Sequence, residues 1–248
     1  MDTPGRKSPG NGSISLYLYC LDSVDTEGRS FAEMTVRFKE HSPEAAAVEL
    51  QRGFTEVARL DPDMKRVLSE VGEPDVTLRP RGFAMFLRGI IAQQVSVKAA
   101  ASIYGRVEDK AGQPVTAEKI QKLGVMGCRE LGMSQRKAEY ALGLAEAELR
   151  GQIDFGDLEQ MPDEEAIARL VELRGIGRWT AEVYLLLSLG RPNIWPAADL
   201  ALMNAIGRIK KLENRPTIGQ ATDIAELWKP WRGSAALLLW HYYKKMPA

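Results

Sequence analysis

The chain has 248 residues, of which 45% are hydrophobic and 27% are charged, and its formal net charge is zero. This composition is ordinary for a soluble globular protein and allows one large domain or two closely packed subdomains. No apolar stretch approaches the roughly 18–20 residues that span a bilayer, and Ile14–Leu21 is a poor signal-peptide core. The two cysteines, Cys20 and Cys128, define neither a disulfide framework nor a metal site. We therefore expect a reduced, cytosolic protein without membrane association.

The charged residues are distributed unevenly. Residues 201–248 contain eight basic and three acidic residues, an excess of five positive charges, whereas Glu40–Asp75 is rich in acids. This asymmetry suits a protein with one phosphate-facing side, although a solvated surface gives similar counts. Nucleic-acid binders are often basic overall, so the zero net charge by itself argues mildly against that class.

The first 42 residues differ in composition from the rest. Met1–Ser13 is rich in Gly, Pro and Ser, which predicts a flexible tail. Ile14–Val24 could form one strand, but no partner strand follows it. We therefore expect a flexible tail over residues 1–42 and a folded domain over residues 43–248.

From Ser42 onward the sequence has a helical pattern. Ser42 followed by Pro43 is a typical helix start, and Ser134 is a second expected cap. Short connections and the lack of strand alternation predict an all-α fold of roughly ten helices. In chain order, the predicted helices are Glu44–Leu60, Pro62–Gly72, Phe83–Gln93, Ser96–Asp109, Ala117–Leu123, Ser134–Arg150, Pro162–Leu173, Arg178–Leu189, Asp199–Lys210, Thr217–Trp228 and Arg232–Lys244.

The most specific string, Leu-Arg-Gly-Ile-Gly-Arg-Trp-Thr-Ala, spans Leu173–Ala181 between two predicted helices. Gly175 and Gly177 permit positive φ and leave backbone N–H groups uncovered, and Ile176 is expected to point inward as an anchor. The unsatisfied N–H groups of the following helix face the same space, which favours an anion such as a DNA phosphate. The alternative is a plain glycine-containing corner between two helices.

About twenty residues later, Trp195–Leu202 places Asp199 after a Pro-Ala-Ala turn, where the next helix should start. An aspartate there can simply be an N-cap, which contributes about 1 kcal/mol. It can also oppose positive charge that develops on a sugar, or orient an attacking water. The two interpretations are compatible, because capping would fix the carboxylate in position.

Together, these two segments resemble the helix-hairpin-helix DNA glycosylase superfamily. Within it the chain looks most like the alkylation-repair branch, 3-methyladenine DNA glycosylase II. The resemblance covers about Ala47 to Tyr243. Further similar segments are Ile90–Ser96, Met133–Tyr140 and Trp228–Arg232 with Trp240.

The resemblance implies a role for each matched position. Asp199 is the expected catalytic carboxylate, and Gln94 stands where some relatives insert an apolar wedge into the duplex. The carbonyls of Leu173 and Gly175 could hold a monovalent cation. The expected contacts with the DNA backbone are Arg174, Gly175, Ile176, Gly177, Arg178 and Thr180. The expected lining of the pocket for a flipped base is Trp179, Trp240, Tyr184 and Phe83.

The aromatic assignments have a physical basis. An alkylated purine carries positive charge, and an indole face attracts a cation by roughly 0.5–2 kcal/mol. Stacking also holds an extrahelical base without reading its edge. Core packing is the alternative for any one tryptophan, and it is the expectation for Trp228 and Trp231.

The sequence departs from parts of the superfamily pattern. Bifunctional relatives carry a lysine where Trp179 stands, so strand cleavage through a Schiff base is not expected. The four cysteines of iron–sulfur relatives are missing. About 45 N-terminal residues are too few for the sheet-containing domain of some members. A polar Gln94 leaves the wedge role open.

The sequence thus predicts two helical subdomains that flank a DNA-binding cleft, with a hairpin subdomain at about 112–203 and the other from 43–111 plus 204–248. We expect a monomeric, monofunctional DNA N-glycosylase of a bacterial or archaeal cytosol that acts on damaged duplex DNA. The expected lesions are 3-methyladenine and 7-methylguanine, and hypoxanthine or ethenoadenine remain open. No cofactor or catalytic metal is expected. The alternatives are a bifunctional glycosylase/lyase and a non-catalytic DNA-binding lesion sensor.

Overall fold

A computed structural model describes residues 42–245, and within this range every regular element is a helix. The all-α prediction is therefore confirmed for the described residues, while the predicted tail and the strand at Ile14–Val24 lie outside them. The helices are α2 (Pro43–Leu60), α3 (Pro62–Val71), α4 (Phe83–Ala92), α5 (Val97–Ala111), α6 (Ala117–Glu130), α7 (Gln135–Leu149), the 3₁₀ turn η2 (Asp157–Glu159), α8 (Asp163–Val171), α9 (Arg178–Leu187), α10 (Leu200–Ile209), α11 (Ile218–Ala225), the 3₁₀ turn η3 (Glu226–Trp228) and α12 (Arg232–Lys245).

The predicted helix starts agree with the caps in the structure. The hydroxyl of Ser42 accepts a hydrogen bond from the N–H of Ala45, and that of Ser134 accepts one from Lys137. The largest difference lies in α6, which was predicted to end at Leu123 but continues to Glu130. Gly124 interrupts the helix with φ 64°, after which helical geometry resumes. A glycine that reads as a helix end can therefore be a kink within one helix.

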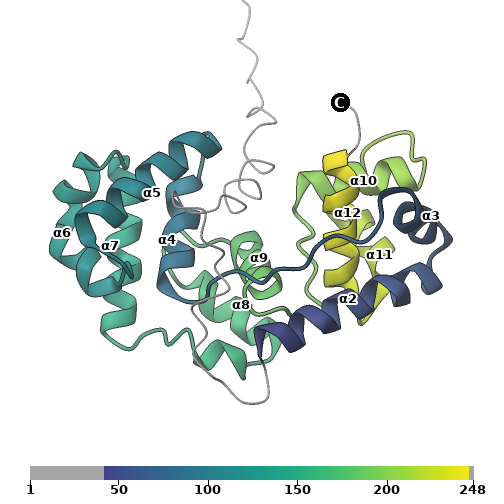
Figure 1. Ribbon diagram of the computed structural model, residues 1–248, viewed down its shortest axis with the longest axis horizontal. Helices are drawn as coiled ribbons and strands as arrows, with labels where there is room; N and C mark the ends of the chain where they lie inside the picture. Colours follow the sequence, from purple (N-terminus) through teal and green to yellow (C-terminus); the bar gives the residue numbers. More distant parts are fainter. Residues whose placement is uncertain (1–41, 246–248) are drawn as a thin grey trace, which may run out of the picture.

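The helices pack in two groups joined by a central pair. Helices α4 to α7 pack on one another, and α2 and α3 pack with α10, α11 and α12. Figure 1 shows the first group on the left, the second on the right, and α8 and α9 between them. Residues 83–111, which the sequence analysis grouped with 204–248, lie in the first group, because α4 packs against α5 and α7 and α5 packs against α6. The extended segment 72–82 carries the chain from one group to the other, which sequence order alone did not indicate.

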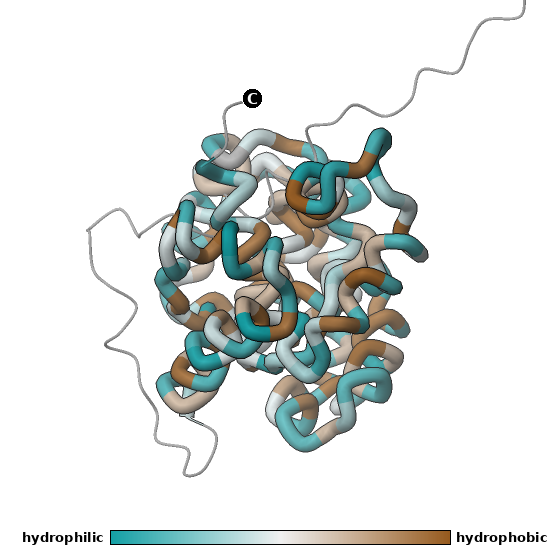
Figure 2. The backbone as a smooth tube through the Cα atoms, turned by 90° about the vertical axis from the view of Figure 1, so that its right-hand side faces the viewer, coloured by the Kyte–Doolittle hydropathy of each residue, from teal (hydrophilic) through white to brown (hydrophobic). Residues whose placement is uncertain are grey.

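The core follows from the amphipathic helices. Hydrophobic and hydrophilic residues alternate along most of the tube in Figure 2, as expected for helices that bury one face. Helix α4 is the exception, since eight of its ten residues are buried. No helix within residues 42–245 is long and apolar enough to span a membrane.

A buried polar cluster fixes α10 against the N-terminal helices. Lys210 Nζ lies 2.7 Å from Asp61 Oδ2 and 3.0 Å from Asp63 Oδ2, and the indole N–H of Trp228 donates to Asp61 Oδ2 at 2.9 Å. Trp228 is fully buried, as the sequence predicted. Asp61 is almost inaccessible to solvent, so the ammonium group of Lys210 and the indole N–H of Trp228 offset the cost of removing its carboxylate from water. The cluster therefore orients α10, whose N-cap is Asp199.

Candidate active site

Asp199 is the N-cap of α10, and its side chain is fully buried. Its Oδ1 accepts a hydrogen bond from the N–H of Leu202 at 2.9 Å. A turn precedes the helix, in which the N–H of Asp199 donates to the carbonyl of Pro196 at 3.0 Å. The capping interpretation is therefore confirmed, and the cap holds the carboxylate in one position.

Two tryptophans from different helices donate to the same carboxylate. Trp179 of α9 donates its indole N–H to Asp199 Oδ2 at 3.1 Å, and Trp240 of α12 donates to Oδ1 at 3.1 Å. Trp240 is 5% exposed, whereas Trp179 is only half-buried. The structure thus brings together three of the residues that the sequence singled out. It also gives the indole N–H groups a function that stacking alone did not imply.

The environment of Asp199 opposes ionisation of its carboxyl group. Burial raises the pKa of Asp199, and the hydrogen bonds from Leu202, Trp240 and Trp179 act in the opposite direction. The site therefore holds a carboxylate whose ionised form depends on the donors around it. Such a group is suited to stabilising a cation that forms beside it.

The hairpin lies directly before α9. Ile176 is 4% exposed and anchors the turn, as predicted. Gly175 adopts φ 95°, but Gly177 adopts φ −92°, so the expectation of positive φ is met only at the first glycine. Gly177 is instead the N-cap of α9 and has no side chain to cap the helix. A helix start without a side-chain cap is consistent with the predicted phosphate site.

The two hairpin arginines differ in their surroundings. Arg178 donates to Glu182 Oε1 at 2.9 Å and to Glu164 Oε1 at 2.7 Å. Burial raises the pKa of Glu182 to about 7. Arg174 is exposed, with its guanidinium carbon 5.6 Å from the centroid of the Tyr140 ring. Arg174 is therefore better placed than Arg178 to reach a phosphate, and the contact expected of Thr180 stays a prediction.

The backbone carbonyls of the hairpin already have partners. The carbonyl of Leu173 accepts from the N–H of Ile176 at 3.0 Å, and that of Gly175 accepts from the side chain of Gln93 at 3.1 Å. A carbonyl oxygen has two lone pairs, so each can accept a further contact. The expected cation at these carbonyls stays a prediction.

Gly175→Ala is expected to destabilise the protein and weaken DNA binding. A Cβ at residue 175 would lie 2.5 Å from Tyr140 Cδ2, in a backbone conformation that disfavours L-residues. The expected loss is about 2 kcal/mol or more, or roughly 4–8 °C in Tm. Thermal unfolding and DNA titration measure both effects.

Gly177→Ala is the matched control, because no atom lies within 4 Å of a Cβ added there. Its Tm should stay within about 3 °C of the wild-type value. An equal loss of Tm in both variants would show that the Tyr140 contact and the positive φ do not matter.

Two of the expected pocket residues, Tyr184 and Phe83, are buried in the core and do not line the cavity beside Trp240. Tyr184 is 2% exposed, packs against Phe86 with ring centroids 4.3 Å apart, and accepts a hydrogen bond from the N–H of Gly82 at 3.0 Å. Phe83 is 5% exposed. Tyr184 follows Trp179 by five residues, which places it about 140° around the helix from that indole. A role for Tyr184 and Phe83 in the pocket stays a prediction.

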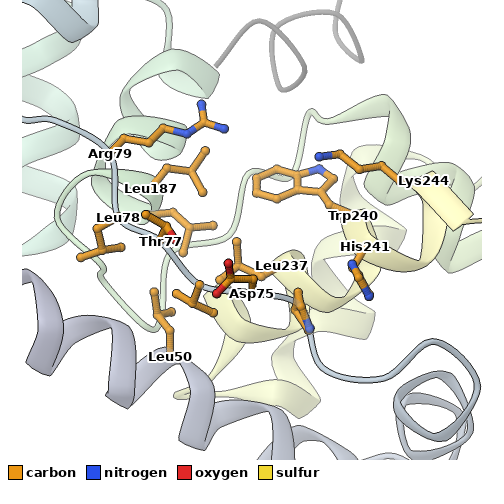
Figure 3. A pocket seen from close by; sticks show the side chains of 13 residues that line it. Leu50, Asp75, Thr77, Leu78, Arg79, Leu187, Leu237, Trp240, His241 and Lys244 are labelled. Carbon is orange, nitrogen blue, oxygen red and sulfur yellow. The ribbon is translucent and has the colours of Figure 1, made fainter. Parts of the chain in front are cut away.

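A cavity of about 360 Å³ lies beside Trp240, with walls from α2, segment 74–79, α9 and α12. Figure 3 shows the Trp240 indole on one side and Arg79, Leu78 and Leu187 on the other. Lys244 also lines it. The volume is at the lower end of the range of roughly 300–1,000 Å³ for small-molecule pockets. The sequence does not predict this wall, because segment 74–79 has no periodic pattern and resembles a connection between helices.

Comparisons with known proteins agree with this geometry. Residues 87–231 match the family model described as HhH-GPD superfamily base excision DNA repair protein. A Schizosaccharomyces pombe protein named DNA-3-methyladenine glycosylase 1 is 32% identical over 203 residues, which cover 79% of this chain and 89% of that protein. YfjP of Bacillus subtilis is 32% identical over 161 residues, which cover 62% of this chain but only 56% of that protein.

A solved structure supports the same assignment. The S. pombe 3-methyladenine DNA glycosylase Mag1 in complex with abasic DNA has a TM-score of 0.68 and 32% identity to this chain. The match covers 76% of this chain and 95% of that one. The chain belongs to the HhH-GPD superfamily of base excision DNA repair proteins.

Proposed function

We propose that the protein is a monofunctional DNA N-glycosylase that releases alkylated purines of the 3-methyladenine and 7-methylguanine type from duplex DNA. The observation that carries the proposal is the buried carboxylate of Asp199, which accepts hydrogen bonds from the indole N–H groups of Trp179 and Trp240. Trp240 also lines the cavity, and Trp179 belongs to the Leu173–Ala181 hairpin segment. The relative from S. pombe is named for 3-methyladenine, and the Mag1 structure contains abasic DNA, the product of base release. The protein would act as a cytosolic monomer.

The base-binding step uses the cavity beside Trp240. The hairpin and Arg174 hold the backbone of the damaged strand, and the nucleotide turns out of the duplex toward α9 and α12. The base enters the cavity and stacks on the Trp240 indole. An alkylated purine that carries a positive charge gains a cation–π attraction of about 0.5–2 kcal/mol there.

The chemical step breaks the bond between sugar C1′ and the base. The bonding electrons leave with the base, which is a good leaving group because it is already cationic, and the sugar becomes an oxocarbenium ion. The ionised Asp199 carboxylate stabilises that cation and guides water to C1′. Water forms the new C–O bond and loses a proton, which leaves an abasic site.

Trp179 separates the carboxylate from solvent in the free protein. It covers Oδ2 and is the less buried of the two indoles, so it marks the side from which a sugar approaches Asp199. A direct contact between sugar and carboxylate requires this indole to move, whereas stabilisation through space does not. An indole at position 179 cannot form a Schiff base, which argues against the lyase alternative.

Base release from damaged duplexes tests the proposal. Purified protein is incubated with methylated duplex DNA and with a panel of duplexes that carry single lesions, and the released bases are separated by chromatography. We expect free methylated purines and abasic sites, with no covalent adduct trapped by borohydride. A trapped adduct would favour the bifunctional alternative. Salt-dependent DNA binding without release of any base would favour the lesion sensor.

A further inference from the structure

The turn that carries Gln94 connects α4 to α5 and lies at the end of α4. Gln94 is exposed and adopts φ 56°, which is uncommon for a residue other than glycine. Its neighbour Gln93 is the C-cap of α4 and points its side chain the other way, into the protein. This local geometry presents one glutamine to solvent and uses the other as a structural contact.

Gln93 connects this turn to the hairpin. Its side-chain N–H donates to the carbonyl of Gly175 at 3.1 Å, across 82 positions of sequence. Gly175 is the hairpin residue with positive φ, and the Tyr140 ring lies directly behind it. This hydrogen bond therefore links the positive-φ glycine of the hairpin to the residue directly before Gln94.

Lys137 holds the same turn from the other side. Lys137 is 9% exposed, and its Nζ donates to the carbonyl of Ile91 at 2.7 Å. The last carbonyls of a helix lack partners within the helix, and a cation there also complements the helix dipole. Lys137 precedes Tyr140 by three residues on α7, so one helix face supports both the end of α4 and Gly175.

We infer that Gln93 and Lys137 are positioning residues that keep Gln94 at a fixed spacing from the Leu173–Ala181 hairpin. This inference rests on the proposed function, in which the hairpin holds the DNA backbone while Gln94 fills the space left by the flipped nucleotide. The side chain of Gln93 donates to the Gly175 carbonyl at 3.1 Å, so it holds the turn that carries Gln94 and the hairpin in fixed relative positions. If that hydrogen bond is lost, the hairpin still binds phosphate, but Gln94 no longer meets the duplex at the right place.

Gln93→Ala and Gln93→Met test the inference, because the second nearly keeps the size of the side chain but removes the donor without adding a charge. Each should slow single-turnover base release about fivefold to tenfold, as expected for one lost hydrogen bond, with DNA affinity changed by less than about threefold. Gln121→Ala is the matched control. Its side chain donates to the carbonyl of Leu142 at 3.1 Å, a contact between α6 and α7 that involves no hairpin residue. This control should keep the wild-type rate of base release.

A double-mutant cycle separates positioning from general destabilisation. In a Gln94→Ala background, Gln93→Ala should change the rate by less than about twofold, because the residue that it positions is already gone. The same fivefold to tenfold loss in both backgrounds would overturn the inference, and so would an equal loss in Gln121→Ala. Lys137→Arg should retain a nearly wild-type rate, since it keeps a cationic donor. Lys137→Met, which lacks the donor, should be as slow as Gln93→Ala, and a wild-type rate in a normally folded Lys137→Met protein would remove Lys137 from the pair.

A binding assay keeps this inference separate from the proposed function. The duplex contains a tetrahydrofuran abasic analogue with 2-aminopurine beside it, so unstacking raises fluorescence without any base release. Wild-type protein should give a larger rise than Gln93→Ala at saturation. A wild-type protein that unstacks this duplex but releases no base from methylated DNA would contradict the proposed function and leave the positioning role standing. A rise of equal size in both proteins, or none in wild type, would overturn the positioning role.

Discussion

Asp199→Asn should bind duplex DNA with nearly wild-type affinity and lose base release by about a thousandfold or more, the scale expected when a preorganised charge is removed from a transition state. The substituted side chain keeps an oxygen that can accept from the N–H of Leu202, and asparagine caps helices about as well as aspartate. It lacks the negative charge that opposes the cationic sugar. Single-turnover release from methylated DNA and titration of an abasic analogue measure the two quantities.

Asp223→Asn is the matched control, since Asp223 is exposed on α11 and the substitution removes the same charge. Its release rate should equal that of wild type.

The pH dependence of stability gives a second check on Asp199. Burial raises the pKa of Asp199 in the folded state, so wild type should lose free energy of unfolding relative to Asp199→Asn as pH rises through that pKa. Full release activity in Asp199→Asn would contradict the proposed mechanism.

Helix positions could be predicted from the sequence because their signals are local. Caps such as Ser42 and Ser134, prolines at first turns and apolar periodicity act over a few residues, and the structure has the corresponding helices. The grouping of the helices could not be predicted in the same way. It depends on where the extended segment 72–82 carries the chain, and no periodicity within that segment encodes its direction.

The site shows the same division between local and tertiary information. Asp199 and the hairpin could be located because each has a local turn signal, and Trp179 and Trp240 because their aromatic positions match the family pattern. The sequence does not identify the contacts of Gln93 and Lys137, because their partners lie 82 and 46 positions away. For Lys137 the sequence does contain a signal, since this lysine stands beside the alanines on the buried face of α7. An unpartnered charge on an apolar face is costly, so its position predicts a buried hydrogen-bond partner.

Trp179→Phe should shift the pH dependence of base release toward higher pH. The substitution keeps an aromatic ring but removes the indole N–H that donates to Asp199 Oδ2. That hydrogen bond favours the ionised carboxylate, so its loss raises the pKa of Asp199 beyond the increase caused by burial. A higher pKa leaves a smaller ionised fraction at any pH below it. Release rates should therefore fall more on the acid side of the profile than on the alkaline side, where the carboxyl group stays ionised in both proteins.

The matched control for this profile is Trp228→Phe. Trp228 donates its indole N–H to Asp61 Oδ2 at 2.9 Å, in a buried cluster outside the site. Its loss should lower Tm without moving the acid limb of the rate profile. If Trp179→Phe lowers the rate by the same factor at every pH, Trp179 acts by stacking alone. A shift restricted to Trp179→Phe would instead show that the indole N–H of Trp179 helps to keep Asp199 ionised inside an apolar site, where burial alone would favour the neutral acid.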